Sequence, residues 1–599
     1  MFGIRERGLF FITIAILGFS GLAFAQEPSL DLEPIIISKA GVHLLNSYTV
    51  EGEKLRDFSG SAIEALSVLP LDLQSRSLKG GIQTDFSLRG STYQGVLLLV
   101  NGQRINDPQT GHHNSDIPFT SEDIERIEVI PGVSSSLFGP DAIAGAINII
   151  LKEPSKRKVV GELSAGQYQS KAARFSIEDK KGKAGVRFSI ERQESDGFRY
   201  DTDFKEFTTS LSSSYDIPDG KFFANLGYQD KEFGAYDFYT PASGYPSKEW
   251  TQTYLIDTGL DLNKGDLTIK STLLWRRHFD KFMLDKTELR SRYLNHHRTD
   301  LLTPAIYFQK KSDSLGKTGL GLEYGQERLD STNLGKDVRS HKSVFIDNAK
   351  ELDCGLSIGS SFRVDDYDGF AEALSGSLSL RYMLRPRNSL HLGVSRSVRV
   401  PCFTELYYND PITSGNPGLC PENALSYQAG YNYKRKGLAA GVVFFLRQEE
   451  DMIDWVKQQP SQAKWQAENI TEDEVKGAEG YLKIDLTQRL SLSSNYTYID
   501  KRVNDRGYLY KYGENYCRHL INADLTVKLP FGTQTVSAAY KKRPQRDGWF
   551  LLNTCFSYGL NKNSRLFLKI DNLLNVEYQE IEGIPQPGRW VEAGLRFEW

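Results

Sequence analysis

Two adjacent histidines, His112 and His113, stand among amide, hydroxyl and carboxylate side chains in the stretch DPQTGHHN. Imidazole nitrogens bind transition metals or haem iron, and they also form hydrogen bonds with polar ligands. On an extended chain, neighbouring side chains point to opposite sides, so we expect at most one of the pair to face a ligand. Metal ligation, hydrogen bonding to a ligand and a role in loop structure all remain open for this pair.

Two turns carry polar tips of the kind that suits a large polar ligand. The tips combine hydroxyl, amide, imidazole and carboxylate groups, which can form many hydrogen bonds to one molecule. The candidate ligand-binding residues are Thr92, Tyr93 and Gln94 in the first tip, and Asp107, Gln109, Thr110, His112, His113 and Asn114 in the second.

The densest aromatic loop is EFGAYDFYTPASGYPSKEW, which contains Tyr236, Phe238, Tyr239, Tyr245 and Trp250. Aromatic walls grip large planar or amphipathic ligands. Aromatic rings also gather where a protein meets a membrane–water boundary. The sequence supports both interpretations equally.

Three carboxylates in ESDGFRYDTDF, those of Asp196, Asp201 and Asp203, are candidate ligands of a structural Ca²⁺ ion. Hard cations prefer clusters of carboxylate oxygens. The alternative is a solvated loop without a metal, and no other cofactor is expected.

Five cysteines are present, and Cys402 and Cys420 bracket one loop-like stretch in which they could form a disulfide. The alternative is that all five are isolated thiols. No C-x-x-C spacing supports a metal site. No G-x-S-x-G or H-E-x-x-H motif occurs either, so we do not expect an enzyme.

The first 25 residues predict a secretory signal peptide: Arg5 and Arg7 precede an apolar run that ends in Ala23-Phe24-Ala25. An uncleaved anchor helix is the alternative. We therefore expect an exported protein.

The formal net charge of −3 argues against nucleic-acid binding, which would need a basic face.

From about residue 154 to the end, segments of about ten residues alternate apolar and polar side chains between turns. The stretch SLSLRYMLRPRNSLHLGVSRS is typical, and so is the terminal VEAGLRFEW. Lipid offers no hydrogen bonds, so a sheet in a membrane must close on itself. The pattern predicts a transmembrane β-barrel over residues 154–599, and a soluble β-sandwich is the alternative.

Residues 45–153 differ, because their short strands GVLLLVNG, IERIEVIPG and GAINIIL are apolar on both faces. Such strands indicate a small α/β unit with a buried sheet. A compact unit in front of a large barrel predicts a plug inside the lumen.

These segments resemble the TonB-dependent outer-membrane receptor family. The resemblance rests on FSLRG, GVLLLVNGQRIND, IERIEVIPG and SLFGPDAIAGAINII in the plug, and on RVPCFTELYYNDPITSGNPGLCPENALSYQAGY and KIDNLLNVEYQ in the barrel. It implies a membrane all-β fold, with a 22-stranded antiparallel barrel that encloses the plug. The C-terminal strand then resembles the signal that the outer-membrane assembly machinery reads, or it is simply the seam strand.

The resemblance also implies partners: TonB with its ExbB/ExbD energy-transducing complex, outer-membrane lipid and lipopolysaccharide, around a monomeric barrel. Within the expected N-terminal periplasmic segment 26–44, the residues Leu32, Glu33, Pro34, Ile35, Ile36, Ile37 and Ser38 resemble a TonB box. A short β-branched segment can add as a strand to a partner's sheet edge. A disordered tether or a first plug strand is the alternative.

Arg89, Arg126 and Glu128 are expected to form ion pairs between plug and barrel wall, with ordinary plug packing as the alternative. Chain length and compact plug loops look most similar to cobalamin (vitamin B12) receptors, with ferric-siderophore and haem receptors as alternatives. A passive porin would need no plug, and an adhesive barrel would need no N-terminal handle.

Overall fold

The computed structural model describes residues 47–52, 55, 61–77, 79–132, 135–239, 243–288, 293–503, 507–513 and 515–599. The predicted signal peptide and the predicted TonB box, Leu32–Ser38, lie outside these residues. Within the described part of the chain, no helix is long and apolar enough to cross a membrane.

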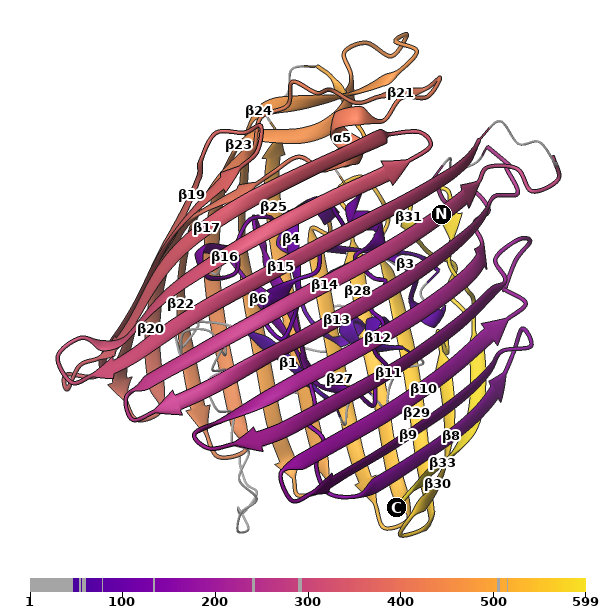
Figure 1. Cartoon of the computed structure of the whole chain (residues 1–599). Helices are drawn as coiled ribbons and strands as arrows, with labels where there is room; N and C mark the ends of the chain where they lie inside the picture. Colours follow the sequence, from indigo (N-terminus) through magenta and orange to yellow (C-terminus); the bar gives the residue numbers. More distant parts are fainter. Residues whose placement is uncertain are drawn as a thin grey trace, which may run out of the picture. The chain divides into compact units, whose positions relative to one another are not determined.

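Twenty-two long strands close into an antiparallel barrel in the described structure (Figure 1). The alternating pattern predicted the barrel, and the family resemblance implied its number of strands. Two short strands, β21 (Thr413–Ser414) and β26 (Leu509–Tyr510), are added at the rim. The long strands are β8 (Lys158–Gly166), β9 (Lys171–Lys181), β10 (Ala184–Ser195), β11 (Phe204–Ile217), β12 (Gly220–Gly234), β13 (Lys248–Lys264), β14 (Leu267–Met283), β15 (Leu294–Ser312), β16 (Gly316–Ser331), β17 (Gly335–Glu351), β18 (Leu356–Tyr367), β19 (Ala373–Arg385), β20 (Asn388–Arg399), β22 (Glu422–Arg435), β23 (Leu438–Lys457), β24 (Trp465–Thr487), β25 (Leu490–Val503), β27 (His519–Leu529), β28 (Gly532–Lys542), β29 (Trp549–Asn561), β30 (Ser564–Asp571) and β33 (Trp590–Glu598).

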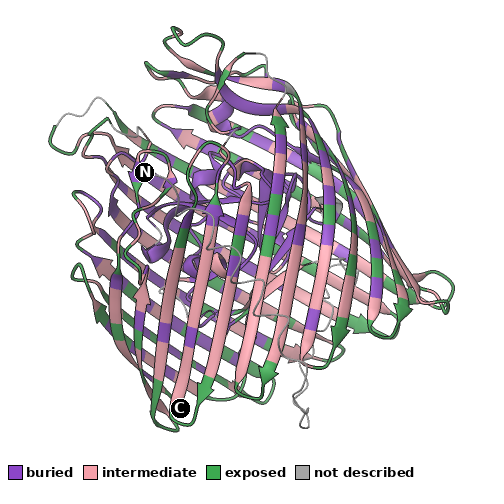
Figure 2. Ribbon diagram, turned by 180° about the vertical axis from the view of Figure 1, so that it is seen from behind, coloured by how far each residue is buried: buried purple, intermediate pink, exposed green. Residues whose placement is uncertain are grey.

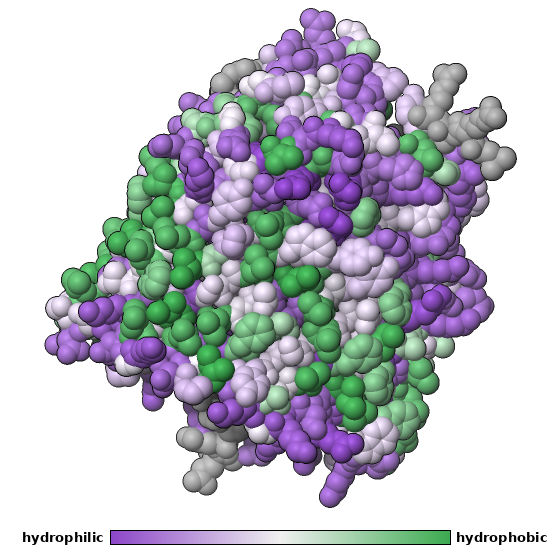
Figure 3. Space-filling model, viewed as in Figure 1, coloured by the Kyte–Doolittle hydropathy of each residue, from purple (hydrophilic) through white to green (hydrophobic). Residues whose placement is uncertain are grey.

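Side chains alternate between the outer face and the lumen along these strands. In β17, Val344 and Ile346 are 50% and 48% exposed, whereas Phe345 and Asp347 point inward and are only 2% exposed. Apolar residues therefore gather over the outer surface of the strands, between more hydrophilic ends (Figure 3). This is the surface that a lipid bilayer requires of a β-barrel.

The two ends of the barrel differ in their connections. At one end, short turns such as 182–183, 218–219 and 265–266 join consecutive strands. At the other end the connections are longer, and 400–421 includes the helix α5 (Phe403–Tyr407) and β21. We call the second the long-loop end; outer-membrane barrels place their longer loops outside the cell.

The terminal strand β33 closes the barrel, because it pairs with β30 on one side and with β8 on the other. Arg596 points inward from β33 and forms ion pairs with Glu162 of β8 (3.1 Å) and Glu122 of the plug (2.7 Å). The half-apolar, half-charged pattern of this strand thus reflects one face toward lipid and one toward the plug.

The plug is a five-stranded mixed sheet with the order β1-β6-β7-β4-β5, in which β4 and β7 run parallel. It lies within the ring of barrel strands (Figure 1). Its elements are β1 (Tyr48–Glu51), α3 (Ala62–Ala65), η1 (Leu66–Val68), β2 (Asp72–Ser77), η2 (Lys79–Gly81), β3 (Ile82–Ser87), η3 (Tyr93–Gly95), β4 (Val96–Val100), β5 (Gln103–Arg104), η4 (Gly111–His113), β6 (Ile124–Pro131), α4 (Ser135–Phe138) and β7 (Gly145–Leu151). A separate pair, β31 (Gln579–Ile581) and β32 (Ile584–Pro585), lies in the loop before β33.

The plug core is apolar and includes part of the barrel wall. Leu98, Val129 and Ile147 from three plug strands share one cluster with Leu255 and Leu274 of β13 and β14. Buried residues are concentrated where the plug meets the strands (Figure 2). The plug is therefore held by packing as well as by the polar contacts described below.

Candidate functional site

Four rings meet where the plug faces the long-loop end, and we call them the apical cluster: Tyr93, His112, Tyr239 and Tyr512. His112 of η4 stacks on Tyr93 of η3, with ring centroids 4.2 Å apart and planes 16° apart. Tyr512 from the loop after β25 packs edge-on against Tyr93 at 5.2 Å. Tyr239 from the loop after β12 lies 6.1 Å from His112. Plug and barrel thus contribute two rings each.

Polar side chains of the two plug tips fix the backbone under this cluster. Gln94 Oε1 accepts a hydrogen bond from the backbone N–H of Gly111 (3.1 Å). Thr110 caps η4, and its hydroxyl accepts from the N–H of His112 (3.5 Å). Asn114 Oδ1 accepts from the N–H of Asp107 (2.9 Å). These predicted ligand-binding residues shape the tips; of the stacked pair above them, the Tyr93 ring is half-buried and the His112 ring is buried.

The remaining tip residues contact the long-loop end or stand at its edge. Gln109 accepts a backbone hydrogen bond from the N–H of Thr404 in α5 (3.0 Å). Thr92 and Tyr93 are half-buried, whereas the other predicted tip residues are buried. Helix α5 therefore locks the second tip against the barrel loop 400–421.

The apical cluster stands on a balanced set of charges. Asp85 of β3 bonds His112 Nδ1 (2.7 Å) and Arg76 of β2 (3.1 Å). Burial alone would raise the pKa of the Asp85 carboxyl, but His112 and Arg76 hold this pKa at about 2. Burial lowers the pKa of His112 below its usual value despite Asp85. Arg76 supplies the guanidinium that pairs with the Asp85 carboxylate beneath the rings.

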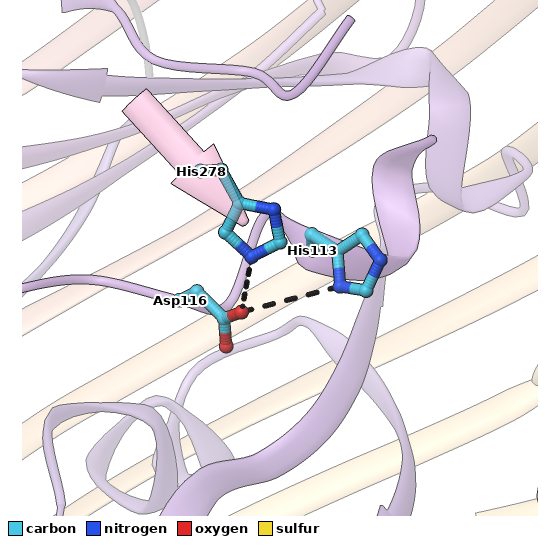
Figure 4. A group of neighbouring side chains, drawn as sticks. All are labelled: His113, Asp116 and His278. Carbon is cyan, nitrogen blue, oxygen red and sulfur yellow. Dashed lines mark hydrogen bonds and ion pairs between the residues drawn. The ribbon is translucent and has the colours of Figure 1, made fainter. Parts of the chain in front are cut away.

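His113 points away from the apical cluster, toward the barrel wall. Its Nε2 lies 3.4 Å from Asp280 of β14, and its ring lies 4.6 Å from that of His278. Figure 4 shows His113 with Asp116 and His278. Burial lowers the pKa of His113, but the hydrogen bond and charge of Asp280 outweigh it and raise this pKa to about 9. The backbone here is a 3₁₀ turn rather than the extended chain that the sequence suggested, yet the two imidazoles still diverge.

Arg89 is the predicted plug residue that pairs with the barrel wall. It forms two hydrogen bonds to the Glu479 carboxylate of β24, at 2.9 and 2.7 Å, and one to Gln428 of β22 at 3.1 Å. Both members of the ion pair are buried. Such bidentate pairing fixes orientation as well as position.

Sequence reasoning missed a wider set of buried plug–wall ion pairs. They join Arg104 to Glu327 (2.6 Å), Asp107 to Arg276 (2.6 Å), Asp116 to Lys231 (2.9 Å), Glu122 to Arg596 (2.7 Å), Glu64 to Lys569 (3.0 Å) and Asp72 to Arg543 (3.0 Å). The only sequence signal for such a pair is a charged residue at an inward position of an alternating strand. This signal does not identify the residue with which the charge pairs.

The expectation for Arg126 and Glu128 is wrong. Arg126 pairs with Glu128 (2.9 Å) and Glu125 (3.2 Å), and Glu128 also accepts from Asn148 (3.1 Å). All of these residues belong to β6 and β7, in the plug sheet. The described contacts therefore hold the plug together rather than attach it to the wall.

The five predicted loop aromatics do not form one wall. Only Tyr239 reaches the apical cluster among the described contacts. Phe238 is buried in an apolar cluster against which Tyr239 packs, and Tyr236 packs against Tyr200. Tyr245 is 40% exposed, and Trp250 of β13 lies under the Lys281 ammonium at 4.5 Å. The loop thus supplies one ring to the site.

Two other predictions have different outcomes. Cys402 and Cys420 are free thiols, so the predicted disulfide is wrong. Cys402 is the N-cap residue of α5 and contacts Gln94 (3.1 Å), whereas Cys420 is exposed and its backbone N–H donates to Asn469.

Of the three carboxylates predicted to bind calcium, that of Asp201 pairs with Lys286. The calcium site at Asp196, Asp201 and Asp203 stays a prediction.

Comparison with known proteins identifies the family. Residues 163–573 match the family "TonB dependent receptor-like, beta-barrel", and residues 45–146 match the "TonB-dependent Receptor Plug Domain". The vitamin B12 transporter BtuB of Vibrio vulnificus (strain CMCP6) is 25% identical over 566 residues, covering 90% of each chain. The iron-regulated outer membrane virulence protein of Vibrio cholerae (El Tor Inaba N16961) is 24% identical and covers 98% of each chain.

Solved structures share the fold. The siderophore receptor PirA of Pseudomonas aeruginosa superposes with a TM-score of 0.75 at 16% identity, over 92% of this chain and 99% of that one. A ferric enterobactin receptor (PfeA) from the same organism, a mutant in complex with enterobactin, gives 0.76 at 17% identity, with the same coverage. With the closed barrel and its enclosed plug, these matches show that the chain belongs to the TonB-dependent receptor family of outer-membrane β-barrels.

Proposed function

We propose that this protein actively imports a large, scarce nutrient of the cobalamin class across the outer membrane, powered by TonB. The observation that carries the substrate class is the similarity to vitamin B12 transporters along 90% of both chains. The apical cluster supports it, because stacked rings over a charge-balanced base suit a large, planar, polar and uncharged ligand.

The plug makes import an energy-requiring step. Nanomolar binding corresponds to about 12 kcal/mol, so a ligand caught at low concentration does not leave inward unaided. The buried ion pairs between plug and wall resist displacement, since leaving one partner of such a pair buried without its counter-charge costs about 3–5 kcal/mol. Work applied to the plug from the periplasm would break these contacts one after another and open a passage.

We assign the handle for that work to Leu32–Ser38. The segment precedes the plug in the sequence and can add as a β-strand to the sheet edge of TonB. Deleting residues 33–38 tests this role: uptake by cells should vanish, while surface binding of the ligand and assembly of the barrel persist. Uptake that survives the deletion would contradict the assignment.

A ferric siderophore is the second candidate, favoured by the relatedness to an iron-regulated Vibrio cholerae protein. Many ferric siderophores are anionic and call for uncompensated cations at the binding face. Arg76, beneath the apical cluster, is paired with Asp85, whereas the exposed Lys511 ammonium, 5.4 Å from the centre of the Tyr512 ring, is the cation that such a ligand would meet. We put cobalamin first because the similarity to vitamin B12 transporters extends over 90% of both chains.

Direct binding separates the candidates. Purified receptor in detergent is titrated with cyanocobalamin, ferric enterobactin and haem, and we expect submicromolar binding of cyanocobalamin only. Tyr93→Ala and Tyr512→Ala should each weaken it about tenfold or more. Tyr215→Ala, at an outward position that is 50% exposed, is the matched control and should bind like the native protein. Binding of haem or enterobactin without cyanocobalamin would overturn the proposed substrate.

A further inference from the structure

A second group of side chains lies beneath the apical cluster, between plug and wall, and plays no part in the proposed import. It comprises His113 of η4, Glu249 of β13, Asp280 of β14 and His297 of β15. The strand register explains the grouping. Asp280 lies opposite His297 across β14 and β15, and opposite Thr251 across β13 and β14. Glu249 is two residues from Thr251 and shares its inward face.

The donor atoms already lie at the spacing of a metal site. One ligand atom from each of His113, Glu249 and Asp280 lies within 4.8 Å of the others. His113 Nε2 and Asp280 Oδ2 are 3.4 Å apart, and His297 Nε2 is 4.0 Å from the same oxygen. Two ligands of a tetrahedral ion with bonds of about 2.1 Å are roughly 3.4 Å apart, so only small movements would be needed.

Neighbouring groups orient the donors as they do around known metal sites. Ser331 Oγ lies 2.8 Å from His297 Nδ1, which leaves Nε2 directed at Asp280. The Tyr239 hydroxyl contacts both Glu249 carboxylate oxygens, at 2.9 and 2.8 Å. Outer contacts of this kind fix the imidazole tautomer and the carboxylate orientation of metal ligands.

Protonated His113 offsets one of the two buried carboxylates of the group, and the hydrogen bonding of Asp280 is incomplete. Asp280 Oδ1 is buried and has no hydrogen-bond partner in the described structure, and Asp280 as a whole is only 5% exposed. The second buried carboxylate, Glu249, is 1% exposed and lies beside it. Burial of two nearby carboxylates is costly without a strong compensating cation.

We propose that His113, Glu249, Asp280 and His297 bind a divalent transition-metal ion that fastens the plug to the barrel wall. Two imidazole nitrogens and two carboxylate oxygens suit Zn²⁺ or a similar ion better than Ca²⁺, which takes oxygen ligands alone. Binding through Nε2 requires neutral His113, so its proton leaves to solvent. Because Tyr239 contacts both Glu249 and His112, the metal site adjoins the apical cluster.

The neighbouring group of His113, Asp116 and His278 (Figure 4) is less suitable. Asp116 already accepts from the Lys231 ammonium (2.9 Å) and contacts His278 Nε2 (2.9 Å). An ammonium at the same carboxylate would repel a metal cation. The two groups share His113, so variants of the other members distinguish them.

The test uses the full receptor in detergent, stripped with a chelator and titrated with Zn²⁺ by calorimetry and with Co²⁺ by visible absorption. We expect one Zn²⁺ per chain with submicromolar affinity, and a Co²⁺ spectrum typical of tetrahedral nitrogen–oxygen ligation. Asp280→Asn and His297→Gln should each weaken binding at least tenfold. His519→Gln, which alters a histidine that contacts Tyr496 on the barrel exterior, should leave it unchanged.

Every outcome bears on the assignment. Glu249→Gln provides a second carboxylate variant if Asp280→Asn fails to assemble, as judged by circular dichroism and thermal unfolding. Absence of saturable Zn²⁺ binding to the native receptor would overturn the proposal. So would binding that survives His297→Gln but is lost in His278→Gln, because the ion would then occupy the neighbouring group. Neither result depends on which nutrient is imported.

Discussion

The Arg89 guanidinium of the plug lies against the Glu479 carboxylate of β24 in a buried bidentate pair, at 2.7 and 2.9 Å. The same guanidinium packs over the Phe445 ring at 4.3 Å. Charge, hydrogen bonding and packing therefore converge on one plug residue. Arg89 belongs to the plug and Glu479 to the barrel. The strength of this pair therefore contributes to how firmly the barrel holds the plug.

Replacing Arg89 should loosen the plug. Arg89→Gln leaves the Glu479 carboxylate buried without its cation, and we expect a destabilisation of about 3–5 kcal/mol. Urea unfolding followed by hydrogen exchange of the plug strands should show their protection lost at lower denaturant, with the barrel strands unaffected. Arg126→Gln is the control, since Arg126 is 26% exposed and its described partners lie within the plug. Equal behaviour of the two variants would contradict a locking role for Arg89.

A glycine sets the stack of the apical cluster. A Cβ at Gly111 would lie 2.7 Å from Gln94 Oε1 and 2.9 Å from Tyr93 Cδ2, so Gly111→Ala must push the two tips apart. We expect about a tenfold loss of cyanocobalamin affinity, together with a change in the near-ultraviolet circular dichroism of the stacked rings. Gly161→Ala is the matched control, because a Cβ there meets nothing within 4 Å. Native affinity in Gly111→Ala would show that the stack is not the binding face.

The alternation of Leu378, Leu380 and Tyr382 with polar neighbours was sufficient to predict strands with one face to lipid, and lipid chemistry then required closure into a barrel. The contacts across the lumen could not be predicted in this way. Tyr512 meets Tyr93 only because barrel closure and register bring a distant loop over the plug. The same cause explains why the predicted disulfide is wrong. Cys402 is buried and contacts Gln94 of the plug, whereas Cys420 is exposed.

Acid should weaken the plug through Asp107. Burial alone would raise the pKa of this carboxyl, but Arg276, His278 and His113 hold its pKa at about 2. The folded-state pKa lies below the ordinary value of about 3.9, so the stabilisation is complete above pH 4 and is lost as the pH falls through 2. Thermal unfolding in detergent should therefore show Asp107→Asn well below the native protein at pH 6. The gap should close near pH 2.

An exposed aspartate provides the comparison for this pH profile. Asp313 lies in the short turn 313–315, and Asp313→Asn should follow the native protein at every pH. A gap between Asp107→Asn and the native protein that persists unchanged at pH 2 would mean that packing, rather than the carboxylate charge, accounts for the loss.

The outer face of β17 offers a test of the membrane placement. Ile346 and Val338 lie on the same face of this strand and are 48% and 55% exposed, but Val338 is close to the long-loop end. If the strands cross a bilayer, a lysine at the deeper position costs about 2–4 kcal/mol, whereas one near the interface costs about 0–1 kcal/mol. Reversible unfolding from lipid vesicles should rank Ile346→Lys as the less stable variant by at least 1 kcal/mol. In water both positions would tolerate lysine equally, so equal stabilities of the two variants in vesicles would contradict a lipid-facing surface at Ile346.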